Sequence, residues 1–283
     1  MASEWLKDVE AHTAPRLIKQ ADAPRILWGD DEAGYVNDII NLHSKELVLA
    51  TICMPPGGFY RASEKHKPIY DATGCFYVLQ GDYTVQLPDT GEVRTMTAGQ
   101  LLILRGPLLH YGYNFGDCET RVLEMISPVP GANAAAIDVK RRPLPNPVRG
   151  VLRDALADFP ASGRSAAYQL EVTCRKSALN AVIGIRTPIR LQIFNSSERI
   201  STAAFSLLAG QRSEPLCFSR ETAIYLEQGV LNVRDLADGK WTEVTAGDTY
   251  FAPADAKWEI FNHGGVTTGG IMTFAGNLAD QIA

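Results

Sequence analysis

The chain has 283 residues, a formal net charge of -5, 46% hydrophobic residues and 21% charged residues. This length allows two domains with sizeable cores, and the composition is that of an ordinary globular protein. The negative charge argues against a nucleic-acid surface, and no basic cluster appears beyond residues 140–142. Five cysteines without close pairing are expected to be reduced thiols, and we find neither a signal peptide nor an apolar run of membrane length. We therefore expect a cytosolic protein.

The N-terminal segment predicts a short helix followed by an extended arm. Ser3 can cap a helix over residues 3–12, whose apolar residues share one side. Residues 16–28 are predicted to be extended, because prolines before and within this segment limit its pairing. Residues 47–53 (LVLATIC) then predict a buried strand.

Glycines punctuate a β-rich stretch from residue 55 to residue 114. The run CFYVLQG ends at Gly81, and a second strand is predicted to begin at Gly99 and to lead towards His110 and Asn114. Several short strands separated by turn signals are typical of an all-β sandwich or barrel.

The rest of the chain predicts a linker and a second barrel. Residues 120–125 are predicted to close the first barrel, and a connector dotted with prolines follows. The connector predicts an inter-domain linker with a short helix over residues 151–158. The predicted domains are an N-terminal helix and arm (1–40), an N-terminal barrel (41–128), the linker (129–165) and a C-terminal barrel (166–283).

An internal repeat indicates two copies of one β unit. A shift of 148 residues, the interval from Gly81 to Gly229, superposes the first stretch on a later one without a gap. The identities in this register are Tyr77 with Tyr225, Gln80 with Gln228, Gly81 with Gly229, Val85 with Val233, Gly91 with Gly239, residues 97–99 with 245–247, and Asn114 with Asn262. So many identities in one register indicate a duplication. Two unrelated sandwich domains with similar turns are the alternative.

The two copies resemble the cupin family, whose jelly roll usually holds one metal ion between two motifs. The motifs are G-x5-H-x-H-x3,4-E-x6-G and G-x5-P-x-G-x2-H-x3-N, which resemble GGFYRASEKHKPIYDATGCFYVLQG and GQLLILRGPLLHYGYN here. The resemblance covers most of the chain and implies an all-β fold of two tandem cupin barrels (double-stranded β-helix or jelly roll) with a few short helices. In cupin-like proteins an N-terminal arm often crosses to a partner subunit, so the resemblance also implies a homodimer.

The second copy departs from the metal motif at every ligand position. In such barrels, imidazole and carboxylate ligands face inward from neighbouring strands, and His-x-His puts both rings on one face. The spacing from Gly210 to Gly229 fits the short form of the first motif. The ligand positions then fall on Leu216, Phe218, Thr222 and Trp258. The resemblance therefore implies a C-terminal barrel without a metal, which has a structural role or an apolar pocket.

The first copy keeps part of the motif. Its interval from Gly58 to Gly81 is longer than the matching interval of the second copy, so two alignments are open. The ligand positions are Glu64, His66, Gly74 and His110 in one alignment, and Pro68, Tyr70, Gly74 and His110 in the other. In both alignments Gly74 replaces the glutamate of the motif. Asp71 is a further carboxylate in the inserted loop.

The resemblance implies one divalent metal ion (iron, manganese, nickel or zinc) at His66, His110 and Glu64. A set of two histidines and one carboxylate leaves open positions for substrate, water or oxygen. Without a metal, His110 and His66 are candidates for proton transfer, because histidine titrates near neutral pH. The alternatives are that either histidine is a hydrogen-bonded core residue and that Glu64 is an exposed loop carboxylate.

Aromatic residues near these positions predict a substrate pocket. Tyr60, Tyr70 and Phe76 are the candidates, although filling of the apolar core explains them equally well. Asn114 and Asn262 are predicted to bond to the backbone at a turn that both copies share.

The resemblance implies an enzyme that acts on a small organic molecule in the N-terminal barrel. Metal-assisted lyase, isomerase or hydrolase chemistry is the first hypothesis, and a metal-dependent dioxygenase is the second. A metal-free, small-molecule-binding protein without catalysis is the third. A nucleic-acid regulator is discounted, because the sequence has no DNA-reading motif.

Overall fold

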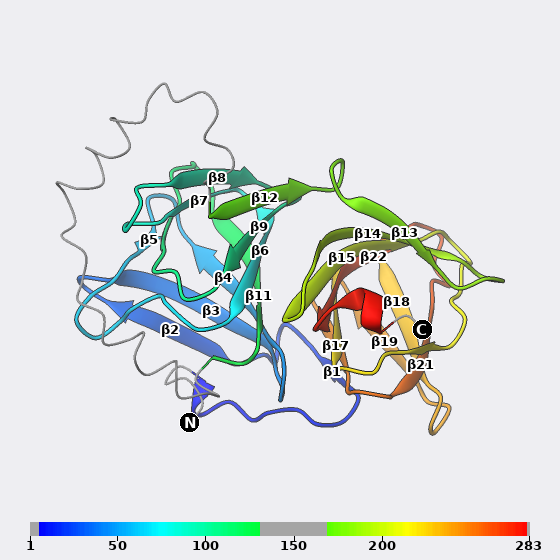
Figure 1. The fold of residues 1–283 in the computed structure, drawn as a ribbon. Helices are drawn as coiled ribbons and strands as arrows, with labels where there is room; N and C mark the ends of the chain where they lie inside the picture. Colours follow the sequence, from blue (N-terminus) through cyan, green and yellow to red (C-terminus); the bar gives the residue numbers. More distant parts are fainter. Residues whose placement is uncertain (1–5, 131–168, 282–283) are drawn as a thin grey trace. The chain divides into compact units, whose positions relative to one another are not determined.

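The computed structural model of the chain describes residues 6–130 and 169–281 (Figure 1). The chain packs into two compact units, and each unit is built from segments that are not contiguous in the sequence. Of the described residues, the first unit takes in 6–8, Arg25–Ile39, 51–130 and 169–173, and the second takes in Val9–Pro24, Ile40–Ala50 and 174–281. Among the described residues, each copy forms one seven-stranded and one four-stranded sheet. The predicted all-β double barrel is confirmed.

The first copy has eleven described strands, from β2 to β12. They are β2 (Arg25–Asp30), β3 (Gly34–His43), β4 (Val48–Met54), β5 (Phe59–Tyr60), β6 (Thr73–Gln80), β7 (Asp82–Gln86), β8 (Val93–Thr97), β9 (Gln100–Arg105), β10 (Tyr111–Tyr113), β11 (Thr120–Ser127) and β12 (Leu170–Cys174). The larger sheet has the order β12-β9-β6-β11-β4-β3-β2, and the smaller sheet has the order β5-β10-β7-β8.

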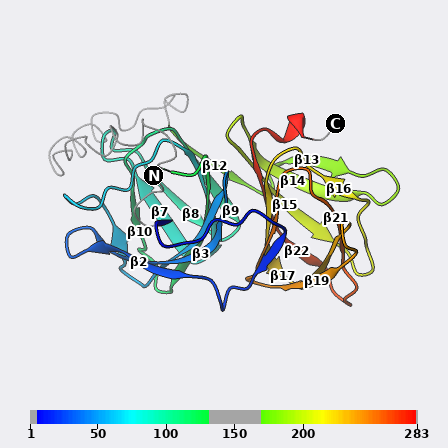
Figure 2. The ribbon, with the colours of Figure 1, turned by 90° about the horizontal axis from the view of Figure 1, so that it is seen from below.

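The second copy repeats this arrangement and ends in a short 3-10 helix. Its elements are β1 (Arg16–Ile18), β13 (Leu179–Ile183), β14 (Ile189–Ser196), β15 (Ile200–Leu207), β16 (Leu216–Cys217), β17 (Thr222–Gln228), β18 (Val230–Asp235), β19 (Trp241–Thr245), β20 (Thr249–Ala252), β21 (Lys257–Phe261), β22 (Thr268–Ala275) and η3 (Leu278–Asp280). The larger sheet has the order β1-β20-β17-β22-β15-β14-β13, and the smaller sheet has the order β16-β21-β18-β19. Figure 2 shows β14 and β15 of the larger sheet side by side.

Strand register confirms the repeat that the sequence predicts. On β6 and β11, Phe76 pairs with Glu124, and on β17 and β22, Ile224 pairs with Met272. Both pairs are related by the shift of 148 residues that aligns the two sequences. The identities in the sequence therefore correspond to equivalent positions in space.

The extended arm pairs within its own chain. The segment predicted to be extended holds β1 and most of β2, and β1 lies antiparallel to β20, from Arg16 opposite Phe251 to Ile18 opposite Thr249. β12 occupies the equivalent edge of the other large sheet, next to β9. An added edge strand satisfies backbone N–H and C=O groups that the edge would otherwise expose. The arm thus completes a sheet of its own chain, and the homodimer stays a prediction.

The helix predicted over residues 3–12 does not extend to residue 12: residue 6 lies in a 3-10 turn, and residues 7–12 are not helical. Residues 7–12 form turns and a bridge, in which His12 pairs with Ser44. His43 Nδ1 donates a hydrogen bond to Val9 O at 2.8 Å. The backbone of this segment is therefore paired with a neighbouring segment instead of with itself. The helix predicted over residues 151–158 and nearly all of the predicted linker lie outside the described residues.

The two asparagines of the repeat have the predicted structural role. The Nδ2 group of Asn114 donates hydrogen bonds to the carbonyl oxygens of Met54, Pro55 and Cys118 at 3.1, 3.0 and 2.8 Å. The Nδ2 group of Asn262 donates to the carbonyl oxygens of Leu207 and Val266 at 3.0 and 2.8 Å. Each side chain thus pairs buried backbone groups at the same turn of its barrel.

The glycines that anchor the repeat are required by the backbone. Gly81 and Gly229 have φ angles of 73° and 80°, in the left-handed region that favours glycine. A Cβ atom at Gly229 would also lie 2.9 Å from Cα of Thr268. Both turns therefore exclude larger residues.

Each barrel has its own apolar core. Val78, Leu102 and Val122 are fully buried in the first barrel, and a larger apolar cluster fills the second. Within the described part of the chain, no helix has the length and apolar character needed to cross a membrane.

Candidate active site

The interior of the first barrel is polar at positions where the second barrel is apolar. The shift of 148 residues relates the polar residues Glu124, His110 and Tyr83 to Met272, Trp258 and Leu231. All six residues are buried, with exposed fractions between 0 and 8%. Because both barrels have the same topology, the fold itself does not require the three polar side chains.

Glu124 lies on β11 with its side chain inside the barrel. It is opposite Phe76, a fully buried core residue, and shares its strand face with the core residue Val122. Tyr70 Oη donates a hydrogen bond to Glu124 Oε1 at 2.8 Å. Burial raises the pKa of Glu124 from 4.5 to about 7, although the hydrogen bond from Tyr70 lowers it. This carboxyl group is therefore poised to gain or lose a proton near neutral pH.

A second interior carboxyl group belongs to Asp38 on β3. Asp38 is 9% exposed, and its Oδ1 atom has no hydrogen-bond partner among the described residues. Burial raises the pKa of Asp38 well above its usual value, and the charge of Glu124 raises it further. One strand, β4, separates β3 from β11, so the backbones that carry the two acids are about 10 Å apart.

His110 packs against three aromatic rings in the barrel interior. Its ring centroid lies 5.8 Å from Tyr60, 5.8 Å from Tyr70 and 5.6 Å from Phe76, and only 2% of the residue is exposed. Burial lowers the pKa of His110 from 6.5 to about 4, so the ring is neutral at physiological pH. Nδ1 lies 3.2 Å from Leu108 O, and a carbonyl oxygen only accepts. Nδ1 therefore carries the proton, and Nε2 is left as a base.

Two further tyrosines extend this cluster. Tyr60 Oη and Tyr83 Oη are 2.5 Å apart, and both residues are buried. Burial raises the pKa of both hydroxyls, so they stay protonated. The Trp28 ring lies 6.0 Å from Tyr60 and adds another aromatic surface. Aromatic faces and protonated hydroxyls therefore surround the imidazole and the carboxyl group.

His66 and Glu64 have other surroundings. His66 Nδ1 lies 3.1 Å from Asp30 Oδ2, and its ring packs edge-on against Trp28 with centroids 5.2 Å apart. Hydrogen bonds, chiefly from Ala33 N, lower the pKa of Asp30, so its carboxylate stays ionised to hold His66. Glu64 is exposed.

The described residues do not assemble the donor set that the metal motif requires. In residues 6–130 and 169–281, no group of three or more His, Cys, Asp or Glu side chains is placed to hold a metal ion. Glu64, His66 and His110 are therefore not such a group. At Gly74, where the motif has glutamate, an added Cβ atom would lie 2.6 Å from Tyr70 Oη. The tyrosine hydroxyl thus fills the space in which the ligand side chain would begin.

The structure resolves the two alignments of the first motif. Tyr70 packs against His110 and bonds to Glu124, which favours the alignment with Pro68 and Tyr70 at the ligand positions. The predicted pocket residues Tyr60, Tyr70 and Phe76 all surround His110.

The sequence reasoning missed Glu124 and Asp38. Comparison with Met272 at the shift of 148 residues would have singled out Glu124, because a carboxylate stands where the other copy has an apolar residue.

The second barrel has a packed apolar interior at the equivalent place. Leu216 pairs with Trp258 across β16 and β21, and the Phe218 ring lies 5.0 Å from Phe274 and 6.1 Å from Trp258. These side chains belong to one buried cluster. This arrangement agrees with a structural role.

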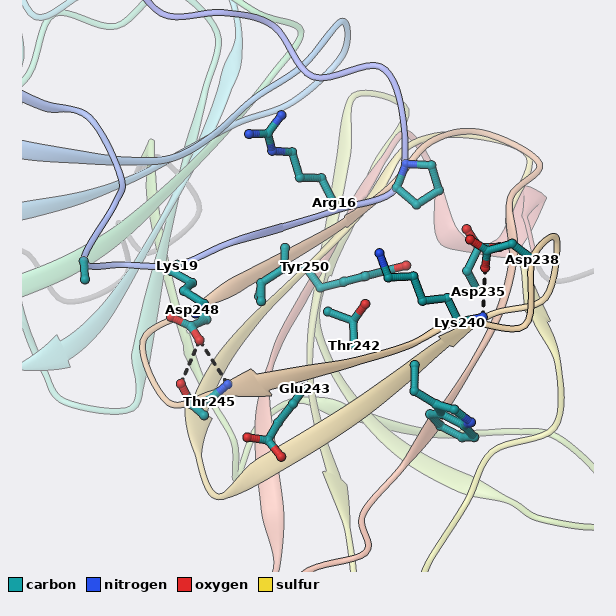
Figure 3. Close-up of a pocket in the computed structure, with 14 residues that line it drawn as sticks. Arg16, Lys19, Asp235, Asp238, Lys240, Thr242, Glu243, Thr245, Asp248 and Tyr250 are labelled. Carbon is teal, nitrogen blue, oxygen red and sulfur yellow. Dashed lines mark hydrogen bonds between the residues drawn. The ribbon is translucent and has the colours of Figure 1, made fainter.

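A groove of about 760 Å³ lies on the second unit, between residues of β1 and β19 (Figure 3). Two of its acidic side chains, Asp248 and Asp238, already have hydrogen-bond partners. Asp248 accepts hydrogen bonds from Gln20 N at 3.0 Å and from Thr245 Oγ1 at 2.7 Å, and Asp238 accepts one from Lys240 N at 2.8 Å. These bonds stabilise the turns and the docked arm. The interior of the first barrel is therefore the candidate active site.

Comparisons with known proteins identify similar folds. No protein-family model matches the chain, and no curated protein sequence matches it. The oxalate decarboxylase of Lactobacillus farciminis, in a formate complex, is 15% identical with a TM-score of 0.60, covering 95% of this chain and 88% of that one. A mutant of Bacillus subtilis oxalate decarboxylase is 14% identical with a TM-score of 0.65, covering 95% and 79%. AerE from Microcystis aeruginosa is 9% identical with a TM-score of 0.58, covering 89% and 97%.

One further similar structure names a metal. It describes the Mn(II) centres of Bacillus subtilis oxalate decarboxylase and is 14% identical to this chain, with a TM-score of 0.64. At these identities the similarity establishes the architecture, and function has to be argued from the side chains of this chain.

Proposed function

Because the chain has the two-domain cupin fold, we propose that its N-terminal barrel catalyses proton transfer on a small organic molecule, in a lyase or isomerase reaction. The observation that carries the proposal is Glu124, a buried carboxyl group with a pKa of about 7. Perturbed carboxyl groups of this kind concentrate at functional sites. The equivalent Met272 argues that this group has a task other than folding.

Glu124 would act as the general base and then as the general acid. As a carboxylate it removes a proton from a substrate carbon next to an electron-withdrawing group. In an isomerase reaction the same proton returns to a neighbouring atom. In a lyase reaction it passes to the departing hydroxyl group, which leaves as water while a double bond forms. A pKa near the working pH suits both directions of transfer.

Tyr70 and His110 would position the base and the substrate. The hydrogen bond from Tyr70 holds Glu124 Oε1 in place. The neutral His110 ring offers Nε2 as an acceptor for a hydroxyl or N–H group of the substrate. Tyr60 and Phe76 supply flat apolar surfaces beside it. The site therefore combines one proton-transfer group with groups that orient a small molecule.

The proposed mechanism contains no step through a metal ion. A divalent ion is suggested by the similar oxalate decarboxylases, but the residues described here do not assemble its ligand set. The proposal therefore takes the acid–base alternative that the sequence leaves open, and Glu124 takes the proton-transfer role that the sequence analysis gives to His110 and His66.

The test is deuterium exchange into a panel of small hydroxy, keto and amino compounds. Wild-type protein in deuterated buffer is expected to exchange a carbon-bound proton of at least one compound, measured by proton NMR. Glu124→Gln keeps the shape of the side chain and is expected to slow exchange by about 100-fold or more. Glu119→Gln, which removes a partly exposed carboxylate that pairs with Arg121, is the matched control and is expected to exchange at the wild-type rate.

Two outcomes oppose the proposal. Exchange that continues at the wild-type rate in Glu124→Gln, with the fold checked by circular dichroism, would show that this carboxyl group is not the base. Binding of compounds without exchange of any of them would instead favour the third hypothesis, a binding protein without catalysis.

A further inference from the structure

We propose that the N-terminal barrel selects small organic amines, which bind as ammonium ions between Asp38 and the aromatic residues of the interior. This inference rests on the proposed function, because it names the class of substrate for the same site. It is carried by an unpartnered buried acid, by the aromatic surfaces near it and by the charge of the interior.

Asp38 supplies the binding group. Its Oδ1 atom is buried and lacks a hydrogen-bond partner among the described residues. A buried acceptor without a donor is costly in a folded protein, so such an atom calls for an explanation. A ligand that brings an N–H donor would satisfy it. Glu124, about two strand spacings away on the same sheet, offers a second acceptor for the same ligand.

The charge of the interior favours a cation over an anion. The influences on the pKa of Asp38 are burial and the charge of Glu124, and those on Glu124 are burial and Tyr70. No Lys or Arg of the described residues contributes to either pKa. An anionic ligand would add a buried negative charge without a partner, whereas an ammonium ion would pair with the carboxylate form of Asp38 or Glu124 and stabilise it. The neutral ring of His110 does not supply it.

Aromatic rings line the same region. Trp28 on β2 pairs with Val36, which lies two residues before Asp38 on the same face of β3. Its ring contacts Tyr60, which in turn contacts His110. The faces of tryptophan and tyrosine rings attract cations, and the attraction grows when water is excluded. A carboxylate together with aromatic rings is therefore a suitable environment for an ammonium group.

Three probes of one shape and different charge test the inference. Benzylamine, benzyl alcohol and benzoate are titrated into the full-length protein at about pH 8, about one unit above the pKa of Glu124, and binding is followed by ligand-observed NMR. Benzylamine is expected to bind at least about 10-fold more tightly than either other probe. Asp38→Asn and Glu124→Gln are each expected to remove most of that preference, and Glu119→Gln is expected to retain it.

Each other result overturns the inference. These results are equal or tighter binding of the alcohol or of benzoate, unchanged amine binding in both interior variants, and no binding of any probe. The deuterium-exchange experiment distinguishes failure of the amine preference from failure of the proposed proton transfer. Exchange that depends on Glu124 but occurs only in neutral or anionic compounds contradicts the amine preference alone. Amine binding through Asp38 without exchange contradicts the proposed catalysis alone.

Discussion

Glu124 and Met272 occupy equivalent positions on β11 and β22, yet only one of them can carry a proton. The rise in the pKa of Glu124 from 4.5 to about 7 corresponds to about 3 kcal/mol against the ionised form, at about 1.4 kcal/mol per pH unit. The methionine fills the same space without this cost. At the scale of the residue, the acid therefore reduces stability, and the proposed proton transfer is our explanation for its presence.

Replacing Glu124 should change how stability depends on pH. The folded state holds the Glu124 proton more tightly than the unfolded state does, so this group stabilises the fold below about pH 4.5 and loses that contribution as pH rises to about 7. His110 acts in the opposite direction, because its lowered pKa makes stability fall as pH drops from 6.5 towards 4.

In Glu124→Gln only the contribution of Glu124 is removed. The difference in unfolding free energy between wild type and variant is expected to change by about 3 kcal/mol between pH 4.5 and pH 7, as measured by urea denaturation at a series of pH values. Parallel curves for the two proteins would contradict the placement of Glu124 as a buried titrating group.

Metal removal tests, also at the scale of the residue, whether Glu64, His66 and His110 bind a metal ion. We expect that treatment with a chelator leaves the proton-exchange rate and the melting temperature unchanged, because Glu64, His66 and His110 do not form a ligand group. Elemental analysis of protein purified without a metal-binding tag is the second measurement. About one transition metal per chain, together with loss of exchange after chelation, would restore the metal hypothesis.

At the scale of the element, the two edge strands β1 and β12 lie beside strands that are not their neighbours in the chain. β1 comes first in the chain but lies beside β20. β12 comes after β11 in the chain but lies beside β9. Each of them completes a large sheet at the same edge. A short strand at this place protects backbone groups that would otherwise be open to pairing with another chain.

A core residue of β12 measures what this strand contributes. Leu170 is 2% exposed and belongs to the core of the first barrel. Leu170→Ala is expected to cost about 2–5 kcal/mol of unfolding free energy, because it leaves a cavity in a packed core. Leu27→Ala on β2 is the control, since Leu27 is 68% exposed, and a change within about 0.5 kcal/mol is expected. Urea denaturation gives both values, and equal effects would contradict the assigned packing.

At the scale of the whole molecule, the two barrels share one plan, and the proposed function assigns the chemistry to the first of them. The first holds buried acids and an imidazole, and the second holds a continuous apolar cluster around Trp258 and Phe274. Gene duplication explains this pattern, because one copy can keep the fold while the other keeps the reactive groups. The homodimer and the cytosolic location stay predictions from the sequence.

Paired substitutions test this division. His110→Ala is expected to abolish proton exchange while the protein stays folded. Trp258→Ala at the equivalent position is expected to cost about 3–5 kcal/mol of stability and to leave exchange unchanged under folding conditions. The measurements are exchange by NMR and unfolding by urea. If both variants lose exchange equally without unfolding, the second barrel contributes directly to the chemistry.

The sequence by itself determined the duplication, the two β barrels and the position of His110. Glycines such as Gly81 and Gly229 and the turn residues Asn114 and Asn262 act locally, so their spacing is visible in one dimension. Only the tertiary structure decided what surrounds His110. Asp38 and Glu124 lie far apart in the sequence, and their carboxyl groups become neighbours across β4 only when the sheet forms. Burial then raises the pKa of both acids, the charge of Glu124 raises that of Asp38 further, and neither effect exists before the chain has folded.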